Sequence, residues 1–336
     1  MQIEGRNYRT VWEENKRLFI INQNDLPFKF SIIELKNISE IIAAIKEMKV
    51  RGAPAIGATA ALAYAITVEK SPELEATIYS ALLAARPTAV DLHNSLKIVQ
   101  TAFLINHNPL QALTAARDFV ERSVAECQAI GKYGEALLKN GSRILTHCNA
   151  GALATVDYGT ALAPIRFAHS NGKKVFVYVD ETRPRLQGAR LTAWELAEEG
   201  IPHAIIADNA AGYFLRKGDI DLVITGADRI ACNGDTANKI GTYTKAVLAH
   251  ENGVPFYIAA PWSTFDRNLA NGSLIPIEER DSLEVLSING IKLTSGKSPA
   301  FNPAFDVTPI RYITGFITPA GIISRKEFAR IWEMNI

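Results

Sequence analysis

The chain has 336 residues, of which 48% are hydrophobic and 21% are charged. This length allows two domains with separate cores, and the composition excludes a disordered protein. A formal net charge of +1 excludes a global field that would hold nucleic acid or an acidic membrane. Any anionic ligand is therefore expected to be small and to be bound by a local cluster of basic groups.

The cysteines and the first residues indicate where the protein resides. Cys127, Cys148 and Cys232 are widely separated, odd in number and without any C-x-x-C spacing, which disfavours a disulfide framework and a zinc site. Residues 1–6 lack the apolar region of a secretory signal, and apolar runs elsewhere are interrupted before they reach membrane-spanning length. We expect a cytoplasmic protein that does not cross a membrane.

The first third of the chain predicts a mostly helical domain that begins with a few short strands. Hydrophobic and polar residues alternate over residues 1–35, which is typical of strands. Helical composition follows, with Pro or Gly at several boundaries. The predicted helices cover residues 39–48, 58–67, 72–85, 90–104 and 110–138. We place this domain at residues 1–125.

The rest of the chain, residues 126–336, predicts a Rossmann-like α/β domain. Short β-rich runs alternate here with helical segments, which indicates a parallel sheet with helices on both faces. The long helix that ends near Leu138 is the expected connector. The predicted strands cover residues 143–146, 175–179, 204–207, 222–225 and 255–259.

Residues 50–57, in the helical domain, have the composition of a phosphate cradle. Gly52 allows a ligand to approach the backbone closely, and Pro54 can begin a helix. The planar guanidinium of Arg51 can bind a phosphate through two nitrogens. A helix-to-helix turn with a surface arginine would explain the same residues.

Residues 146–152 follow the first strand of the α/β domain and contain Cys148. We expect helix N-terminal amides and a positive dipole at this position, and both would favour the thiolate. Cys148 is then a candidate acid, base or nucleophile, although a buried cysteine is commonly inert. His147 points to the opposite face of the strand and is interpreted as structural.

Residues 181–195 connect a predicted strand to a predicted helix and carry Arg183, Arg185, Arg190 and Gln187. A core-building turn does not require three arginines. Open α/β sheets bind ligands at such strand ends, and helix N-terminal amides attract negative charge. This segment therefore predicts an anionic small-molecule ligand.

Two further segments contribute polar side chains to the candidate site. Asp228 lies just beyond an apolar strand, where a carboxylate can act as a general acid or base, with a raised pKa if the pocket closes and dries. It can equally cap a turn or pair with Arg229. Residues 233–242 are interpreted as a polar loop entering a helix, in which Asn238 and Lys239 can bind sugar hydroxyls and a phosphate. A solvated loop would also explain this segment.

The placement of these residues is more informative than any one of them. Cys148, Gln187 and Asp228 all follow the carboxyl ends of predicted strands, where a parallel sheet opens its crevice. We expect a single pocket to collect them with Arg51 and Lys239.

With these residues assembled, the chain resembles the methylthioribose-1-phosphate isomerases of methionine salvage. That family is related in fold to the regulatory subunits of translation initiation exchange factor 2B and to ribose-1,5-bisphosphate isomerases. The resemblance extends from about residue 9 to residue 325. It rests on residues 51–57, 85–90, 146–155, 187–196, 226–230, 233–243 and 302–309.

The resemblance implies a homodimeric isomerase that needs neither a metal nor another cofactor. It would convert a 5-methylthio-substituted ribose 1-phosphate into the matching ribulose 1-phosphate. By the family pattern, Asp228 is the proton donor and Cys148 assists the transition state. The substrate-binding residues implied are Arg51, Gly52, Ala53, Arg86, Gln187, Asn238 and Lys239.

The chemistry explains this set of residues. An anomeric phosphate locks the sugar ring, so ring opening needs an acid at the ring oxygen and a tight anion clamp. Hydrogen then moves from C2 to C1, either through an enolate with Cys148 as base or as a hydride shift in a dry, cationic pocket. The sequence leaves both routes open.

Two positions depart from the family pattern, and they concern the substituent at C5. Arg185 and Asn94 stand where the family often carries apolar or aromatic residues, which would hold a methylthio group. The alternative substrates are 5-deoxyribose 1-phosphate and, less favoured, ribose 1,5-bisphosphate. A non-catalytic regulatory protein on the same scaffold is the alternative from another class. A dinucleotide-dependent dehydrogenase is disfavoured because no G-x-G-x-x-G follows a predicted strand.

Overall fold

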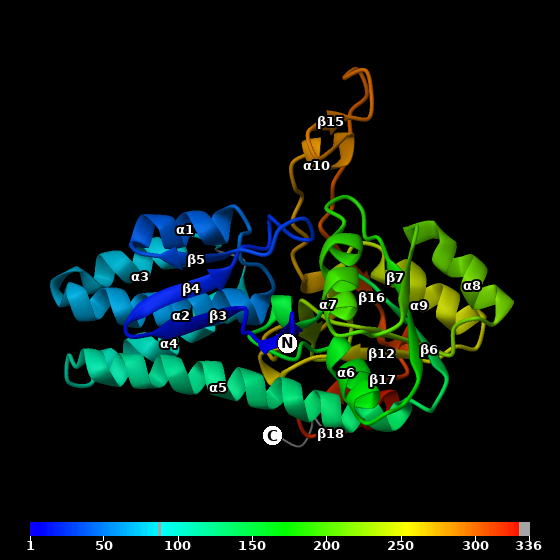
Figure 1. Cartoon of the computed structure of the whole chain (residues 1–336), viewed down its shortest axis with the longest axis horizontal. Coiled ribbons are helices and arrows are strands. Elements are labelled where there is room, and N and C mark those ends of the chain that lie inside the picture. The colour runs from blue at the N-terminus through cyan, green and yellow to red at the C-terminus, as the bar shows by residue number, and fades with distance from the viewer. Residues whose placement is uncertain (87–88, 329–336) are drawn as a thin grey trace. The chain divides into compact units, whose positions relative to one another are not determined.

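The computed structural model describes residues 1–86 and 89–328 of the chain (Figure 1). It divides the chain into two compact units, and the division falls within the long helix α5 (Pro109–Gly134). The predicted domain boundary at residue 125 stays a prediction. Unit 1 comprises Met1–Gln128 and Ala150–Leu162, and unit 2 comprises Ala129–Asn149 and Ala163–Ile336.

Unit 1 begins with short antiparallel strands, as the alternating pattern predicts. β3, β4 and β5 form one antiparallel sheet, in which Leu18 and Ile20 turn the same face towards the helices and are buried. β1 and β2 form a separate two-stranded hairpin. The bounds are β1 (Gln2–Ile3), β2 (Arg6–Asn7), β3 (Val11–Glu14), β4 (Arg17–Ile21) and β5 (Ile32–Leu35).

The helices of unit 1 pack around α2 (Ala53–Lys70). Every residue of α2 from Ala55 to Ile66 is buried, which is typical of a helix at the centre of a core. A Cβ at Gly57 would lie 2.9 Å from the Asp91 carbonyl oxygen, so glycine allows α4 to approach α2 closely. The other helices are α1 (Ile38–Lys46), α3 (Glu75–Leu83), α4 (Val90–Leu104) and α5, with 3₁₀ turns at Pro72–Leu74 and Glu135–Leu137.

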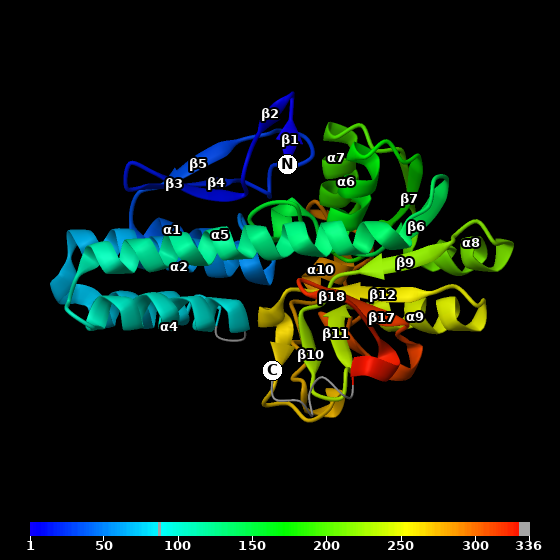
Figure 2. The ribbon, with the colours of Figure 1, turned by 90° about the horizontal axis from the view of Figure 1, so that it is seen from below.

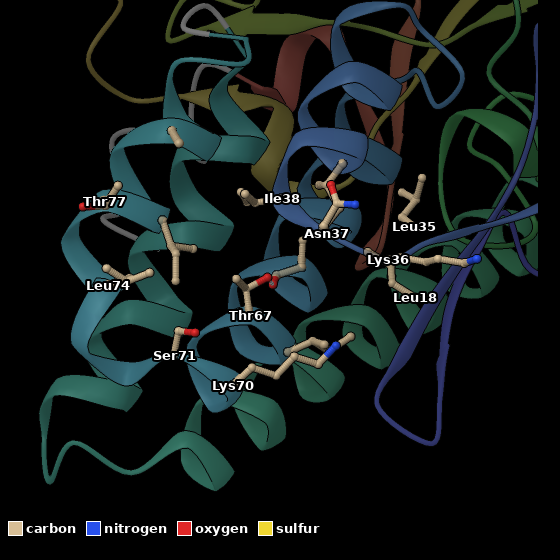
Figure 3. Close-up of a pocket in the computed structure, with 15 residues that line it drawn as sticks. Leu18, Leu35, Lys36, Asn37, Ile38, Thr67, Lys70, Ser71, Leu74 and Thr77 are labelled. Atoms are coloured by element: carbon tan, nitrogen blue, oxygen red, sulfur yellow. Dashed lines mark hydrogen bonds between the residues drawn. The ribbon is translucent and has the colours of Figure 1, made fainter.

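An apolar pocket of about 320 Å³ lies within unit 1, between the strands β4 and β5 and the helices α1, α2 and α3 (Figure 3). Its wall includes Leu18, Leu35, Ile38 and Ile66, with Lys70 among the few charged residues. None of the predicted substrate residues lines it. The pocket is therefore separate from the candidate site described below.

The main sheet of unit 2 has seven strands in the order β18-β17-β12-β9-β6-β7-β8. All neighbouring strands are parallel except β17 and β18. This order confirms the predicted Rossmann-like sheet, whose strand order reverses between β6 and β9. The bounds are β6 (Ser142–Thr146), β7 (Val175–Asp180), β8 (His203–Ile206), β9 (Leu222–Thr225), β12 (Phe256–Ala259), β17 (Gly315–Thr318) and β18 (Gly321–Ser324).

Helices cover both faces of this sheet. Buried side chains of β6, β9 and β12 form one cluster with Leu215 of α8 (Ala211–Lys217) and Ala246 of α9 (Thr242–Glu251). The helices α6 (Leu162–Ser170) and α7 (Ala193–Glu198) lie on the opposite side (Figure 2). A π-helical turn, η4 (Gly188–Thr192), leads into α7. Further 3₁₀ turns cover Ala152–Ala154, Asp208–Ala210, Trp262–Thr264, Gly272–Leu274 and Ile310–Tyr312.

A second sheet of unit 2 corrects one prediction. Residues 233–242 were expected to form a polar loop, but β11 (Thr236–Lys239) pairs with β10 (Arg229–Ala231) as an antiparallel hairpin. All four residues of β11 are buried, three of them polar, so no apolar alternation reveals the strand in the sequence. The strand order is β13-β10-β11-β16, with β13 (Phe265–Asp266) and β16 (Phe305–Thr308) at its edges.

An arm stands out from unit 2 between these edge strands (Figure 1). It carries α10 (Leu283–Leu286) and the hairpin of β14 (Ser287–Ile288) with β15 (Ile291–Lys292). Among the described helices of the chain, none is both long and apolar enough to cross a membrane.

Candidate functional site

The strand order of the main sheet places the candidate site. A parallel sheet binds ligands beyond the carboxyl ends of its strands, at the point where the strand order reverses. In this chain that point lies between the neighbours β6 and β9. Cys148 follows the end of β6, and Asp228 follows the end of β9. The topology therefore brings the two predicted catalytic residues to the same part of unit 2.

The backbone around Cys148 corrects the expected helix N-terminus. Only a 3₁₀ turn at Ala152–Ala154 follows, and the next α-helix begins at Leu162. Cys148 has a left-handed backbone with φ of 64°, which turns the chain sharply after β6 instead of continuing into a helix. The prediction that a helix dipole favours a thiolate at Cys148 is therefore wrong.

Two threonines hold the turn at Cys148. The Cys148 amide donates to Thr182 Oγ1 over 2.9 Å, and Thr192 Oγ1 donates to the Cys148 carbonyl oxygen over 2.7 Å. The first threonine follows β7, and the second belongs to η4. Both bonds join residues far apart in the sequence, which is why sequence reasoning missed them. These bonds fix the backbone of Cys148, whose side chain is half-buried.

A buried charged network supports the next residue. Asn149 Nδ2 donates to Glu195 Oε1 over 2.7 Å, and Arg166 Nη2 donates to Glu195 Oε2 over 2.6 Å. Burial alone would lower the pKa of Arg166, but Glu195 and Glu199 raise it above its usual value. Glu195 is thereby a satisfied structural carboxylate that fixes the chain beyond Cys148. Its role was not visible in the sequence.

Gln187 precedes η4 and presents an unused acceptor. Its side chain is only 7% exposed, and within the described part of the chain its buried Oε1 accepts no hydrogen bond. A buried polar atom without a partner destabilises the protein, so it is expected where a ligand supplies the missing donor. A sugar hydroxyl is such a donor. The next residue must be glycine, because a Cβ at Gly188 would lie 1.7 Å from the Asp180 carbonyl oxygen.

Asn238 and Lys239 lie at the end of β11, and each side chain is only 6% exposed. Asn238 Nδ2 donates to Thr242 Oγ1 over 2.9 Å. Lys239 Nζ donates to the Ala304 carbonyl oxygen over 2.7 Å and lies 4.6 Å from the centre of the Phe305 ring. Lys239 is thus buried, with its Nζ held in a defined position.

The electrostatics of Lys239 link it to the two predicted catalytic residues. Burial lowers the pKa of Lys239, and the charge of Arg280 lowers it further. The negative charges of a Cys148 thiolate and of the Asp228 carboxylate act in the opposite direction. Cys148 and Asp228 therefore both lie within electrostatic range of Lys239. The Asp228 side chain is exposed, so a ligand can reach it from solvent.

Two of the three arginines that suggested an anion site contact the arm. Arg185 Nη1 lies 2.7 Å from Glu284 Oε1, and Arg183 Nη2 donates to the Val285 carbonyl oxygen over 2.8 Å. Burial alone would raise the pKa of Glu284, but hydrogen bonds from Arg185 and Asn302 lower it. Glu284 is then a carboxylate that matches the charge of Arg185. These arginines hold α10 in place.

The remaining predicted substrate residues belong to unit 1. Gly52 caps α2, Ala53 is its first residue, and the amides of the first turn are an anion-binding group. Gly52 has φ of 88°, and a Cβ there would lie 2.2 Å from the Ala154 carbonyl oxygen. Arg51 and Arg86 are half-buried. That one pocket collects these residues together with those of unit 2 stays a prediction.

Comparisons with known proteins identify the family. The model of the initiation factor 2 subunit family matches residues 49–325. Methylthioribose-1-phosphate isomerase 1 from Pseudothermotoga lettingae is 48% identical over 332 residues, which cover 94% of this chain and 96% of the relative.

Solved structures agree with this match. The crystal structure of 5-methylthioribose 1-phosphate isomerase from Pyrococcus horikoshii OT3 has a TM-score of 0.92 and 41% identity, over 98% of this chain and 97% of that one. Subunit delta of translation initiation factor eIF-2B from A. fulgidus has a TM-score of 0.88 and 38% identity, over 97% and 100% of the two chains.

The fold and the strand-end site define a Rossmann-like α/β protein of the kind that binds a small ligand at its sheet switch point. The chain belongs to the initiation factor 2 subunit family and, within it, to the methylthioribose-1-phosphate isomerases. This confirms the resemblance and the fold class predicted from the sequence.

Proposed function

We propose that this chain is an aldose-ketose isomerase that converts 5-methylthioribose 1-phosphate into 5-methylthioribulose 1-phosphate, a step of methionine salvage. The proposal rests on the placement of Cys148 and Asp228 after neighbouring strands at the switch point of the main sheet, within electrostatic range of the buried Lys239. The relatives named as isomerases of this substrate support the same activity.

The proposed roles follow from the chemistry of an anomeric phosphate. Asp228 donates a proton to the ring oxygen, and the bond between that oxygen and C1 breaks. Hydrogen moves from C2 to C1 while the C2 hydroxyl gives its proton to the Asp228 carboxylate and becomes the product carbonyl. Lys239, with Arg51, Arg86 and the amides at Gly52 and Ala53, binds the phosphate, so it is retained throughout. Gln187 and Asn238 bind the sugar hydroxyls.

The transfer of hydrogen has two routes with different isotopic outcomes. If Cys148 removes the C2 proton, an enolate forms and C1 takes up a proton that has exchanged with solvent. If hydride moves directly from C2, no solvent hydrogen enters the product. Reaction in D₂O followed by NMR of the C1 position decides between the routes.

Substrate comparison tests the methylthio group. Arg185 forms an ion pair with Glu284, so the positive charge of Arg185 is already compensated. This disfavours a second phosphate at C5. An apolar subsite should favour the methylthio over the 5-deoxy compound by about 1–3 kcal/mol in kcat/KM. Equal kcat/KM values would remove the methylthio assignment and favour 5-deoxyribose 1-phosphate, and a preference for ribose 1,5-bisphosphate would overturn both.

Two variants test the catalytic roles. Cys148→Ala and Asp228→Asn should each lower kcat by about 10²–10⁴-fold while the fold survives. Cys232→Ala, at a half-buried cysteine next to the β10–β11 hairpin, is the matched control and should retain activity. Near-normal turnover in either site variant would contradict its proposed role.

A regulatory protein on the same scaffold is the second candidate, because the A. fulgidus chain named as an eIF-2B subunit is 38% identical. The presence of both Cys148 and Asp228 at the switch point favours the isomerase. Absence of turnover across a panel of ribose 1-phosphates, with binding retained, would favour the regulatory protein.

We further propose a homodimer in the cytoplasm that acts without a metal or another cofactor and binds neither nucleic acid nor membranes. The arm supports self-association, because Phe301 and Ile291 are 87% and 71% exposed. Light scattering of the purified protein tests the dimer, and Phe301→Ser should weaken it. Cell fractionation tests the location, and full activity after dialysis against a chelator tests the absence of a metal requirement.

A further inference from the structure

His147 is buried beside the candidate site and uses both ring nitrogens. Its side chain is 1% exposed. Nδ1 lies 2.8 Å from Asp180 Oδ2, and Nε2 lies 2.8 Å from the carbonyl oxygen of Ile240. The sequence predicts a structural role for His147, and these two bonds specify which groups its ring joins.

The partners of His147 determine its hydrogens. A carbonyl oxygen only accepts, so Nε2 carries a hydrogen and donates it to Ile240. A proton must also lie between Nδ1 and Asp180 Oδ2, because two lone pairs would otherwise face each other. Lys245 Nζ lies 3.0 Å from the same carboxylate oxygen. Asp180 Oδ2 thus contacts both His147 and Lys245.

The bond to Ile240 joins the two sheets of unit 2. His147 follows β6 of the seven-stranded sheet and immediately precedes Cys148. Ile240 immediately follows Lys239, the last residue of β11 in the four-stranded sheet. One imidazole thus connects the residue before Cys148 to the residue after Lys239.

The turn that receives this bond is fitted closely around the ring. Gly241 has φ of 101°, and a Cβ there would lie 3.1 Å from Cε1 and 3.2 Å from Nε2 of His147. On the other side, Asp306 accepts the amide hydrogens of Gly241 and Tyr243 over 2.7 and 3.0 Å. The turn is therefore held from both sides, with the imidazole against its inner surface.

We infer that His147 is a positioning residue, which sets the spacing of Cys148 relative to Asn238 and Lys239 through its Nε2 bond to Ile240. This role rests on the proposed isomerase function, because Asn238 and Lys239 are proposed there to bind the substrate. His147 itself need not touch the substrate.

Another group of potential metal ligands overlaps this network and carries no separate site. His147, Asp180 and Asp208 lie within 4.8 Å of one another through their ligand atoms. However, Asp208 accepts the amide hydrogens of Thr182 and Arg183 over 2.7 and 2.6 Å. Lys245 would also repel a cation at Asp180.

Two substitutions of His147 each retain one of its two hydrogen bonds and remove the other. In His147→Gln the longer side chain can still donate to the Ile240 carbonyl, as Nε2 does. In His147→Asn the shorter side chain can donate towards Asp180 but does not reach Ile240. His169→Gln, at a histidine in the last turn of α6, is the matched control. The measurements are KM and kcat for 5-methylthioribose 1-phosphate and the midpoint of thermal unfolding.

The inference predicts that His147→Asn raises KM by about 10-fold, the effect of one lost positioning bond, while His147→Gln stays within about 3-fold of the wild type. Equal KM values in the two variants would overturn it, even if both unfold at lower temperature. If the wild type and His169→Gln lack activity, the proposed function fails, which is a different result.

A second variant keeps the test decisive if the His147 variants do not fold. Gly241→Ala places a methyl group against the imidazole and should raise KM in the same way. Gly253→Ala is its control, because Gly253 also has a positive φ, 67°, and a Cβ there would have no atom of residues 1–86 or 89–328 within 4 Å. An unchanged KM in folded Gly241→Ala would contradict the positioning role.

Discussion

Gly52→Ala should destabilise the protein far more than Gly141→Ala, although the two glycines have nearly the same backbone conformation. Gly52 has φ of 88° and Gly141 has φ of 89°, so alanine suffers the same backbone strain at both positions. The difference lies in the space available. A Cβ at Gly141 meets no atom of the described residues within 4 Å, whereas a Cβ at Gly52 lies 2.2 Å from the Ala154 carbonyl oxygen.

The size of the effect follows from these two contributions. The left-handed backbone costs about 1–2 kcal/mol for a residue with a Cβ, and this applies to both variants. Real Cβ atoms essentially never approach a heavy atom closer than 3.0 Å, so Gly52 or Ala154 must also move. Such overpacking costs a further ~1–3 kcal/mol. Gly52→Ala should thus lose about 2–5 kcal/mol of stability and Gly141→Ala about 1–2 kcal/mol.

The same displacement should affect catalysis. Gly52 caps α2 at the proposed phosphate-binding amides, and a shift of ~1 Å in a binding group can lower kcat/KM by about 10²-fold. Gly141 precedes β6 at its amino end, away from the strand ends that form the site, so Gly141→Ala should keep normal kcat/KM.

Urea unfolding and steady-state kinetics of the two variants measure both effects. Equal losses of stability would refute the close contact between Gly52 and Ala154. Normal kcat/KM in a destabilised Gly52→Ala would refute the placement of the phosphate at this helix start.

Three further substitutions test separate parts of the site. Burial lowers the pKa of Lys239 below its ordinary value of 10.5. Between the lowered and the ordinary pKa, the unfolded chain therefore binds more protons than the folded chain. The free energy of unfolding of the wild type should thus rise with pH in that range. Lys239→Met should reduce this rise in urea titrations, while KM increases. Gln187→Leu should leave the unfolding midpoint nearly unchanged, because the amide oxygen has no partner among the described residues to lose, yet lower kcat/KM by about 10-fold. Arg185→Met should speed limited proteolysis of the arm and raise the pKa of Glu284; an unchanged cleavage rate would show that the ion pair does not hold the arm.

Much of the fold was predictable because its strands are apolar and its helices periodic. The five strands predicted from the α/β alternation correspond to β6, β7, β8, β9 and β12. β11 escaped prediction because its buried residues Thr236, Asn238 and Lys239 are polar. Such a strand is stabilised by long-range pairing with β16, which no local pattern reports.

The candidate site, like the fold, was predictable from the sequence only in part. Strand ends indicated Cys148, Gln187 and Asp228, because a parallel sheet collects its carboxyl ends at one edge. The groups that fix these residues were not visible, since they come from distant segments. Thr182 bonds to the Cys148 amide, and His147 bonds to Ile240, 93 residues further along the chain.

NMR of the reaction mixture shows whether the protein isomerises its substrate. Purified protein is mixed with 5-methylthioribose 1-phosphate, and the anomeric C1 signal is followed over time. We expect this signal to be replaced by that of a ketose carbonyl at C2, with the phosphate still attached to C1. An unchanged aldose spectrum, or release of inorganic phosphate without a ketose, would contradict it.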